Sequence, residues 1–198
     1  MATFKQSVYF WPDSSDSIPL NQDLIVIALD TLPTTLRFQA RKLIRIAIKQ
    51  VLAKILGCTF DEIELTFELG QAPRLSQPKH NIGLSISHES GLTIAAIHLN
   101  GKVGVDLLAS KTIPDKGEIE TLALEYLGAQ TAEHLSRMAN LEQKLAFAQA
   151  WTAFEARLKC EEKNLTEWTA SSALQLNMLK VRSLILPDGY IGTIAFSD

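Results

Sequence analysis

The chain has 198 residues, of which 46% are hydrophobic and 21% charged, and its formal net charge is −3. This composition is typical of a globular protein and excludes a disordered one, and the length allows one domain or two small ones. The net charge argues against nucleic acid as a partner, because nucleic-acid binding usually needs an excess or a stripe of basic residues. Two cysteines, Cys58 and Cys160, are too few for a disulfide framework and favour a reducing compartment, the cytoplasm.

Nothing in the sequence predicts contact with a membrane. The longest apolar stretches, Leu24–Leu29 and Leu92–Leu99, are far shorter than the roughly 20 residues that cross a bilayer. The first residues lack the basic and then apolar layout of a signal peptide.

The first half of the chain combines short strands with one long helix. Short β-branched or alternating runs predict strands, in chain order, at Ser7–Trp11, Leu24–Leu29, Glu62–Glu68, Ile82–Ser87 and Leu92–Leu99. Apolar residues at helical spacing predict a helix over Leu36–Leu56. Thr34 or Thr35 is its expected N-cap, and Gly57 ends it in a position that suits a positive φ. The stretch Gly70–Pro78 predicts a loop.

The second half begins after Asn100–Gly101, a pair of residues that favours a two-residue hairpin turn. Alternating runs predict strands at Val103–Leu108, Ser172–Met178, Val181–Leu186 and Tyr190–Phe196. Helical spacing predicts helices at Gly117–Leu127, Thr131–Met138 and Leu141–Lys163.

Together these elements predict an α+β protein whose two halves have similar content. Each half has a long helix followed by strands, and the division falls near Gly101. We therefore expect two subdomains, residues 1–101 and 102–198, each with a long helix packed on a mainly antiparallel sheet. The residues alone do not establish a repeat, so a pseudo-twofold relation between the halves is a hypothesis.

The first long helix carries four cations at successive steps of four residues: Arg37, Arg41, Arg45 and Lys49. This spacing places them on one face of the helix. The common interpretation of such a stripe is a solvated polar face. The alternative is an anion-binding edge, because like charges four residues apart repel one another and gain from a bound phosphate.

The sequence Ser85-Ile86-Ser87-His88 ends an apolar strand with polar residues. A turn is the simpler interpretation. The functional alternative is an anion site, in which a serine hydroxyl, a backbone N–H and the imidazole reach one phosphate.

Asp106 lies within the otherwise apolar strand Val103–Leu108. A carboxylate in that setting loses hydration and needs a cation or strong hydrogen bonds, so a metal ion, an arginine or a hairpin-end position are all possible explanations. Gly104, two residues earlier, allows another backbone or a ligand to come close.

In the last long helix, Glu155 and Lys159 are four residues apart, the spacing of a helical ion pair. For an arbitrary helix, a surface pair worth a few tenths of a kcal/mol is the usual interpretation. Histidine and cysteine spacing for zinc, a P-loop, G-x-S-x-G and G-x-G-x-x-G are all missing from the sequence.

Taken in order, five stretches resemble the 4′-phosphopantetheinyl transferases, specifically the larger single-chain type that primes acyl and peptidyl carrier proteins. That family has an arginine-rich helix, a G-x-P loop, an S-H-S motif, a G-(I/V)-D motif and a W-x-x-K-E-A-x-x-K motif. The corresponding stretches here are Arg37–Leu56, Gly70–Leu75, Leu84–His88, Gly104–Leu108 and Trp151–Lys159.

The resemblance implies two similar domains related by a pseudo-twofold, with coenzyme A and Mg²⁺ held in the cleft between them. It implies that Asp106 and Glu155 ligate the metal, in keeping with the preference of Mg²⁺ for oxygen ligands. Glu155 and Lys159 would be the catalytic residues, with Glu155 or a metal-bound water as the base. The residues implied in binding coenzyme A are Arg41, Arg45, Arg74, Ser87, His88 and Lys159.

The implied partner is an apo carrier protein, and the implied enzyme is a monomer because one chain supplies both sides of the cleft. Three positions depart from the family pattern: Leu108 replaces an acid, Phe154 replaces the lysine before Glu155, and Ala72 replaces the lysine of G-K-P. They motivate the alternative of a non-catalytic relative that binds coenzyme A or a carrier protein.

Overall fold

The computed structural model describes residues 5–19, 21–68 and 71–197, and it confirms an α+β fold. Its strands are β1 (Lys5–Gln6), β2 (Tyr9–Phe10), β3 (Leu24–Asp30), β4 (Glu64–Thr66), β5 (Arg74–Gln77), β6 (Gly83–Glu89), β7 (Leu92–His98), β8 (Val103–Ala109), β9 (Lys180–Leu184) and β10 (Tyr190–Phe196). Its helices are α1 (Arg37–Leu56), α2 (Lys116–Leu122), α3 (Ala129–Ser136), α4 (Asn140–Cys160) and α5 (Ala170–Asn177), and a π-helical turn, Ala123–Leu127, follows α2.

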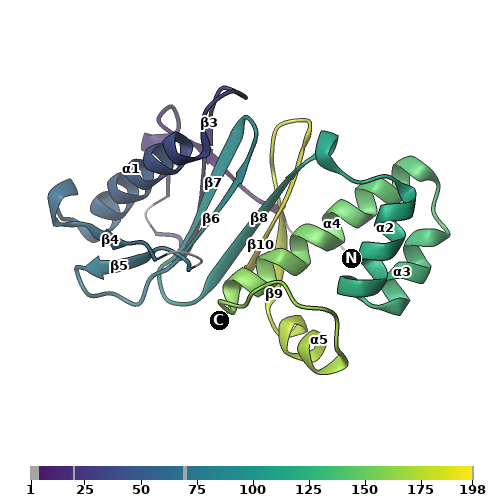
Figure 1. Ribbon diagram of the computed structural model, residues 1–198. Helices are drawn as coiled ribbons and strands as arrows, with labels where there is room; N and C mark the ends of the chain where they lie inside the picture. The colour runs from purple at the N-terminus through teal and green to yellow at the C-terminus, as the bar shows by residue number, and fades with distance from the viewer. Residues whose placement is uncertain (1–4, 20, 69–70, 198) are drawn as a thin grey trace.

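Within the described residues, the strands form two four-stranded sheets and the small β4–β5 ribbon. One sheet has the order β2-β3-β7-β6 and the other β1-β9-β10-β8. Alternate side chains of β3 and β7 pack against α1 on one face and, on the other face, against β8, β9 and β10. The molecule is therefore layered as α1, sheet, sheet and α4, with α2 and α3 beside α4 (Figure 1).

The main elements of the two halves follow in the same order, with the β4–β5 ribbon inserted in the first half and α2, α3 and α5 in the second. In the first half a strand, a long helix and two more strands follow in the order β3, α1, β6, β7, and β7 lies between its neighbours. In the second half β8, α4, β9 and β10 repeat that order, and β10 again lies in the middle. Neighbouring strands in both sets of three are antiparallel. A pseudo-twofold requires this repeated connectivity, but the symmetry and the boundary at residue 101 stay predictions.

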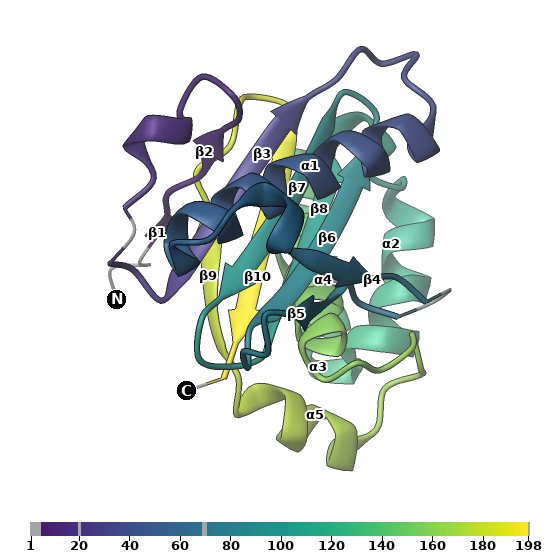
Figure 2. The same cartoon turned by 90° about the vertical axis from the view of Figure 1, so that its left-hand side faces the viewer.

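The two sheets meet along β6 and β8, which lie side by side (Figure 2). Val105 N donates to the Ser85 hydroxyl at 3.0 Å, so this side chain joins the two strands. Both β6 and β8 carry polar residues singled out in the sequence, and this meeting line brings them together.

The structure corrects two expectations about strand pairing. The predicted strand Ser7–Trp11 contains only the two-residue strand β2, and β1, which precedes it, joins the other sheet. Asn100–Gly101 is not a hairpin turn, since β7 before it pairs with β3 and β6 while β8 after it pairs with β10. The turn instead carries the chain from one layer to the next, because β8 must bury its apolar face against the first sheet.

Three local predictions are also wrong. Ser172–Met178 lies in helix α5 and its continuation and is not a strand; the Thr169 side chain accepts a hydrogen bond from Ser172 N and caps this helix. The expected loop Gly70–Pro78 contains β5, although Gly70 itself lies outside the described residues. The N-cap of α1 is Leu36 rather than Thr34 or Thr35.

Candidate functional site

The centre of the candidate site is an ion pair between β8 and α4. Lys159 Nζ lies 2.6 Å from Asp106 Oδ1, and only 11% of the Asp106 side chain is exposed. The Ser87 hydroxyl, at the end of β6, donates to the same Asp106 oxygen at 3.1 Å. Lys159 Nζ also lies 3.2 Å from the Val105 carbonyl oxygen and 3.4 Å from Ser87 Oγ, so all three ammonium hydrogens have acceptors.

Strand alternation explains why Asp106 faces the helix. Val105 and Leu107 point into the core between the two sheets, so Asp106 points to the opposite face, which α4 covers. Gly104 lies on that face too, directly under the helix backbone. A Cβ atom at Gly104 would lie 2.0 Å from the Ala156 carbonyl oxygen and 2.4 Å from Cys160 N. The sequence predicts that another backbone or a ligand comes close to Gly104, and in the structure this is the backbone of α4. The close packing brings Lys159 within reach of Asp106.

Glu155 is one helical turn before Lys159 and completes a pair of carboxylates. Burial and the negative charge of Asp106 raise the pKa of Glu155, while Lys159 opposes the shift. Two carboxylates that repel one another in a half-buried site favour either a shared proton or a bound cation.

The donor set fits Mg²⁺. Asp106, Glu155 and the Ser87 hydroxyl supply oxygen atoms, and Mg²⁺ typically takes one or two carboxylates and keeps the rest of its shell for water and phosphate oxygens. Among the residues that the structure describes, no group of three or more His, Cys, Asp or Glu side chains could enclose a metal.

His88, beside Ser87 on β6, lies in a field of positive charge. Its Nδ1 is 3.0 Å from Thr93 Oγ1 on the adjacent strand β7. Burial, followed by the charges of Arg41, Arg37, Lys159 and Arg45, lowers the pKa of His88 to about 4. The imidazole is thus neutral at pH 7, and the arginine face of α1 is directed towards the same region as Lys159.

The cationic face of α1 is partly covered by aromatic rings. The Arg45 guanidinium lies 3.6 Å from the centroid of Phe67, and the Lys49 ammonium lies 4.2 Å from the centroid of Phe60. Arg45 Nε is buried without a hydrogen-bond partner among the described residues, and burial, helped by the charge of Arg41, lowers the pKa of Arg45. A desolvated guanidinium binds an anion more strongly than a hydrated one.

Arg74 lies on β5, away from the central ion pair, and binds an acid of its own. Its Nη2 is 2.8 Å from Glu162 Oε2, and both side chains are more than half exposed. Glu162 follows α4 shortly after Lys159, so this pair ties the β4–β5 ribbon to the end of the helix that carries the site.

Sequence reasoning missed two residues at this site. Thr93 is the partner of His88, and it lies directly opposite His88 in the antiparallel pairing of β6 with β7. Phe67, just after β4, covers Arg45. It was missed because local patterns do not show which helix a predicted strand contacts.

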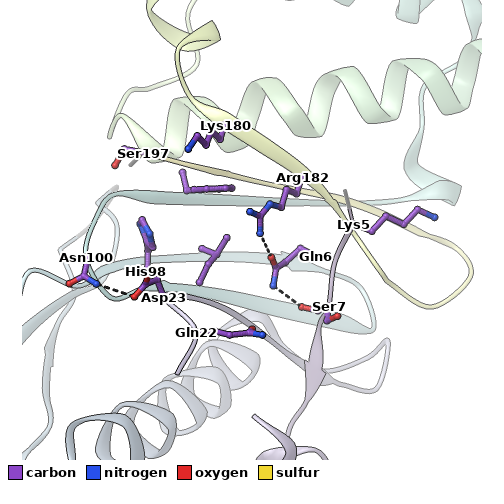
Figure 3. Close-up of a pocket in the computed structure, with 12 residues that line it drawn as sticks. Lys5, Gln6, Ser7, Gln22, Asp23, His98, Asn100, Lys180, Arg182 and Ser197 are labelled. Atoms are coloured by element: carbon purple, nitrogen blue, oxygen red, sulfur yellow. Dashed lines mark hydrogen bonds between the residues drawn. The ribbon is translucent and has the colours of Figure 1, made fainter. Parts of the chain in front are cut away.

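A polar pocket of about 600 Å³ lies at the other end of the strands, and it is not this site. Figure 3 shows its lining, which includes His98, the last residue of β7. Thr93, which contacts His88, lies near the opposite end of the same strand. Its polar side chains largely bind each other: Arg182 donates to Gln6 at 3.0 Å, and Asn100 donates to Asp23 at 3.0 Å. It contains none of the residues that the sequence predicts to be catalytic, to bind coenzyme A or to ligate a metal.

Comparisons with known proteins agree with the resemblance noted in the sequence. No family model matches the chain. A Synechocystis protein named "Putative 4′-phosphopantetheinyl transferase" is 24% identical over 123 residues, which are 62% of this chain and 49% of that protein. The chain is similar to a phosphopantetheinyl transferase. It spans about half the length of the curated relative that it matches. Within the described residues, no helix is both long and apolar enough to cross a membrane.

Proposed function

We propose that the protein is a 4′-phosphopantetheinyl transferase. It moves the phosphopantetheine group of coenzyme A to a serine of an apo acyl or peptidyl carrier protein and releases 3′,5′-ADP. The observation that supports this most is the convergence of Asp106, Glu155 and Lys159 beside Ser87. These residues come from three elements far apart in the chain, and their chemistry suits a diphosphate.

The diphosphate of coenzyme A would lie between α4 and the end of β6. Lys159 and the Ser87 hydroxyl would donate to its oxygens, and neutral His88 has one ring N–H for another. Arg41 and Arg45 would meet the 3′-phosphate from α1, and Arg74 would be available once it exchanges Glu162 for phosphate. When bound at Asp106 and Glu155, Mg²⁺ would neutralise charge on the phosphoryl oxygens.

The transfer step needs a base for the carrier serine. Glu155 fits this role, because it is a carboxylate beside Asp106 and one helical turn before Lys159, and carboxylates act as general bases. A water made more acidic by Mg²⁺ is the alternative base. The serine proton passes to Glu155 as the serine oxygen bonds to the β-phosphorus. The bond from that phosphorus to the bridging oxygen breaks, and the bridging oxygen leaves with the electron pair as part of 3′,5′-ADP. Lys159 stabilises the charge that develops on the phosphoryl oxygens.

The proposal extends to the setting of the reaction. The chain would act in the cytoplasm as a monomer, since one chain supplies Ser87, Asp106 and Glu155 together. Leu108, half-buried at the place of the family's second acid, offers no third carboxylate, so we expect weaker metal binding than in relatives that have one.

A second candidate is a relative that binds coenzyme A or a carrier protein without turnover. It is favoured by the direct contact of Lys159 with Asp106, which occupies a carboxylate oxygen that a metal would need. The two candidates differ in one product. With coenzyme A, Mg²⁺ and several apo carrier proteins, an active transferase releases 3′,5′-ADP, measured by chromatography. Coenzyme A binding with no release from any carrier would favour the second candidate.

A further inference from the structure

Arg157 is a half-buried arginine that the proposed reaction does not use. Its Nε is buried without a hydrogen-bond partner, and no residue in the described ranges forms an ion pair or hydrogen bond with its guanidinium. Burial lowers the pKa of Arg157, and no neighbouring carboxylate opposes the shift. Taking a charge out of water without a counter-charge is unfavourable, so an anion that reaches this guanidinium would stabilise it.

Arg157 lines a pocket of about 220 Å³ between α4, α5 and the π-helical turn Ala123–Leu127. Most of its wall is apolar or aromatic, with Tyr126, Phe154, Trp168 and Leu176 among the lining residues. Ser172 and Asn177, from α5, add polar groups. The pocket thus offers one cation, a few hydrogen-bonding groups and a largely apolar body, the usual make-up of a small-molecule site.

The backbone around the pocket is unusual, and it holds one aromatic wall in place. The π-helical turn is a rare conformation that occurs frequently at functional sites. Gly128, directly after it, has a φ of 87°, and a Cβ there would lie 2.7 Å from the Trp168 indole. Trp168 N donates to the Glu125 carbonyl oxygen at 2.8 Å. The loop after α4 is therefore fastened to the turn so that Trp168 faces the pocket.

We propose that this pocket binds a small organic carboxylate whose body is about one aromatic ring in size. A cavity of about 150 Å³ is enough to hold benzene in another protein, so about 220 Å³ has room for a ring and a carboxylate. A guanidinium pairs with a carboxylate through two parallel hydrogen bonds, which would supply the partner that Arg157 lacks. Inorganic phosphate would leave the aromatic wall unused.

The pocket is separate from the site of the proposed transfer. Two residues, or about 200° of helix, separate Arg157 both from Glu155 and from Lys159, so these residues lie on opposite faces of α4. The inference therefore stands whether or not the protein transfers phosphopantetheine. An Asp106→Asn variant should bind the carboxylate as the unchanged protein does.

Titration of the full chain with phenylacetate tests the proposal. The indole N–H signal of Trp168 in an NMR spectrum reports on the pocket. The indole of Trp11, which donates to Gln50 at 2.8 Å and lies on the α1 side of the molecule, is an internal control. We expect the Trp168 signal to shift in a saturable way while the Trp11 signal stays in place. Phenylacetamide, which has the same shape without the charge, should bind at least tenfold more weakly.

Variants separate the role of the charge from that of the cavity. Arg157→Met should lose at least tenfold in phenylacetate affinity, and Arg157→Lys should keep part of it. Arg137→Met, on an exposed arginine paired with Glu133, should bind like the unchanged protein. The proposal is wrong if phenylacetate does not shift Trp168, if acid and amide bind equally, or if Arg157→Met binds phenylacetate normally. The comparison of acid with amide needs no variant, so it decides the matter even if Arg157→Met fails to fold.

Discussion

Gly104 of β8 lies in direct contact with the backbone of α4 at Ala156, where a single added methyl group would be 2.0 Å from the carbonyl oxygen. Helix and strand come this close only because Gly104 has no side chain. This contact sets the distance between α4 and β8, and therefore how close Glu155 and Lys159 lie to Asp106.

Gly104→Ala should therefore displace α4. Overpacking of this kind costs about 1 to 3 kcal/mol in the free energy of unfolding, and the shift should also separate Lys159 from Asp106. Urea unfolding measures the first effect, and the rate of phosphopantetheine transfer measures the second. Gly117→Ala is the matched control, because its added Cβ would meet only Asp115, at 3.9 Å, and alanine favours the helix by about 0.5 to 1 kcal/mol. Equal stability of the two variants would contradict the packing described here.

Lys159→Met should destabilise the protein at neutral pH by leaving the buried Asp106 carboxylate unpaired beside Glu155. We expect a loss of about 2 kcal/mol, less than for a fully buried pair because 32% of the Lys159 side chain is exposed. Lys159→Met with Asp106→Asn should recover part of this loss, since the repulsion on Glu155 is then gone. Unfolding curves that match those of the unchanged protein would show that the ion pair contributes nothing.

His88 should titrate well below the ordinary value of 6.5, with a pKa of about 4 in the free protein. Between pH 6.5 and 4 the unfolded chain takes up a proton at this residue and the folded chain does not, so the free energy of unfolding falls as the pH falls through that range. Bound 3′,5′-ADP should raise the pKa, because its phosphates offset the nearby arginine charges. NMR titration follows the imidazole signals, with His88→Gln to assign them. A midpoint near 6.5 in the free protein would contradict the positive field around His88.

Much of the candidate site was visible in the sequence because its residues break the local pattern. Asp106 stands out in an apolar strand, and alternation alone places it on the face opposite Val105. Glu155 and Lys159 share a helix face by spacing. Their convergence on Asp106 was implied by the family resemblance, because local patterns carry no information about which helix covers which strand.

The sequence was least informative where long-range packing decided the outcome. Asn100–Gly101 has the chemistry of a hairpin turn, but the demand for a buried face on β8 moves that strand to the other sheet. Ser172–Met178 has an alternating pattern that also fits a helix, and the cap at Thr169 selects the helix. Arg157 gave no signal, because an arginine in the last turn of a helix is common on protein surfaces.

The most direct test of the account is the mass of an apo carrier protein after incubation with this protein, coenzyme A and Mg²⁺. Transfer adds the phosphopantetheine group, a gain of about 340 Da at the modified serine. We expect this gain with the unchanged protein and with Glu142→Gln, an exposed control on the same helix. Glu155→Gln should slow it about 100-fold or more. A carrier mass that never changes, or a Glu155→Gln variant as fast as the unchanged protein, would contradict the role assigned to this site.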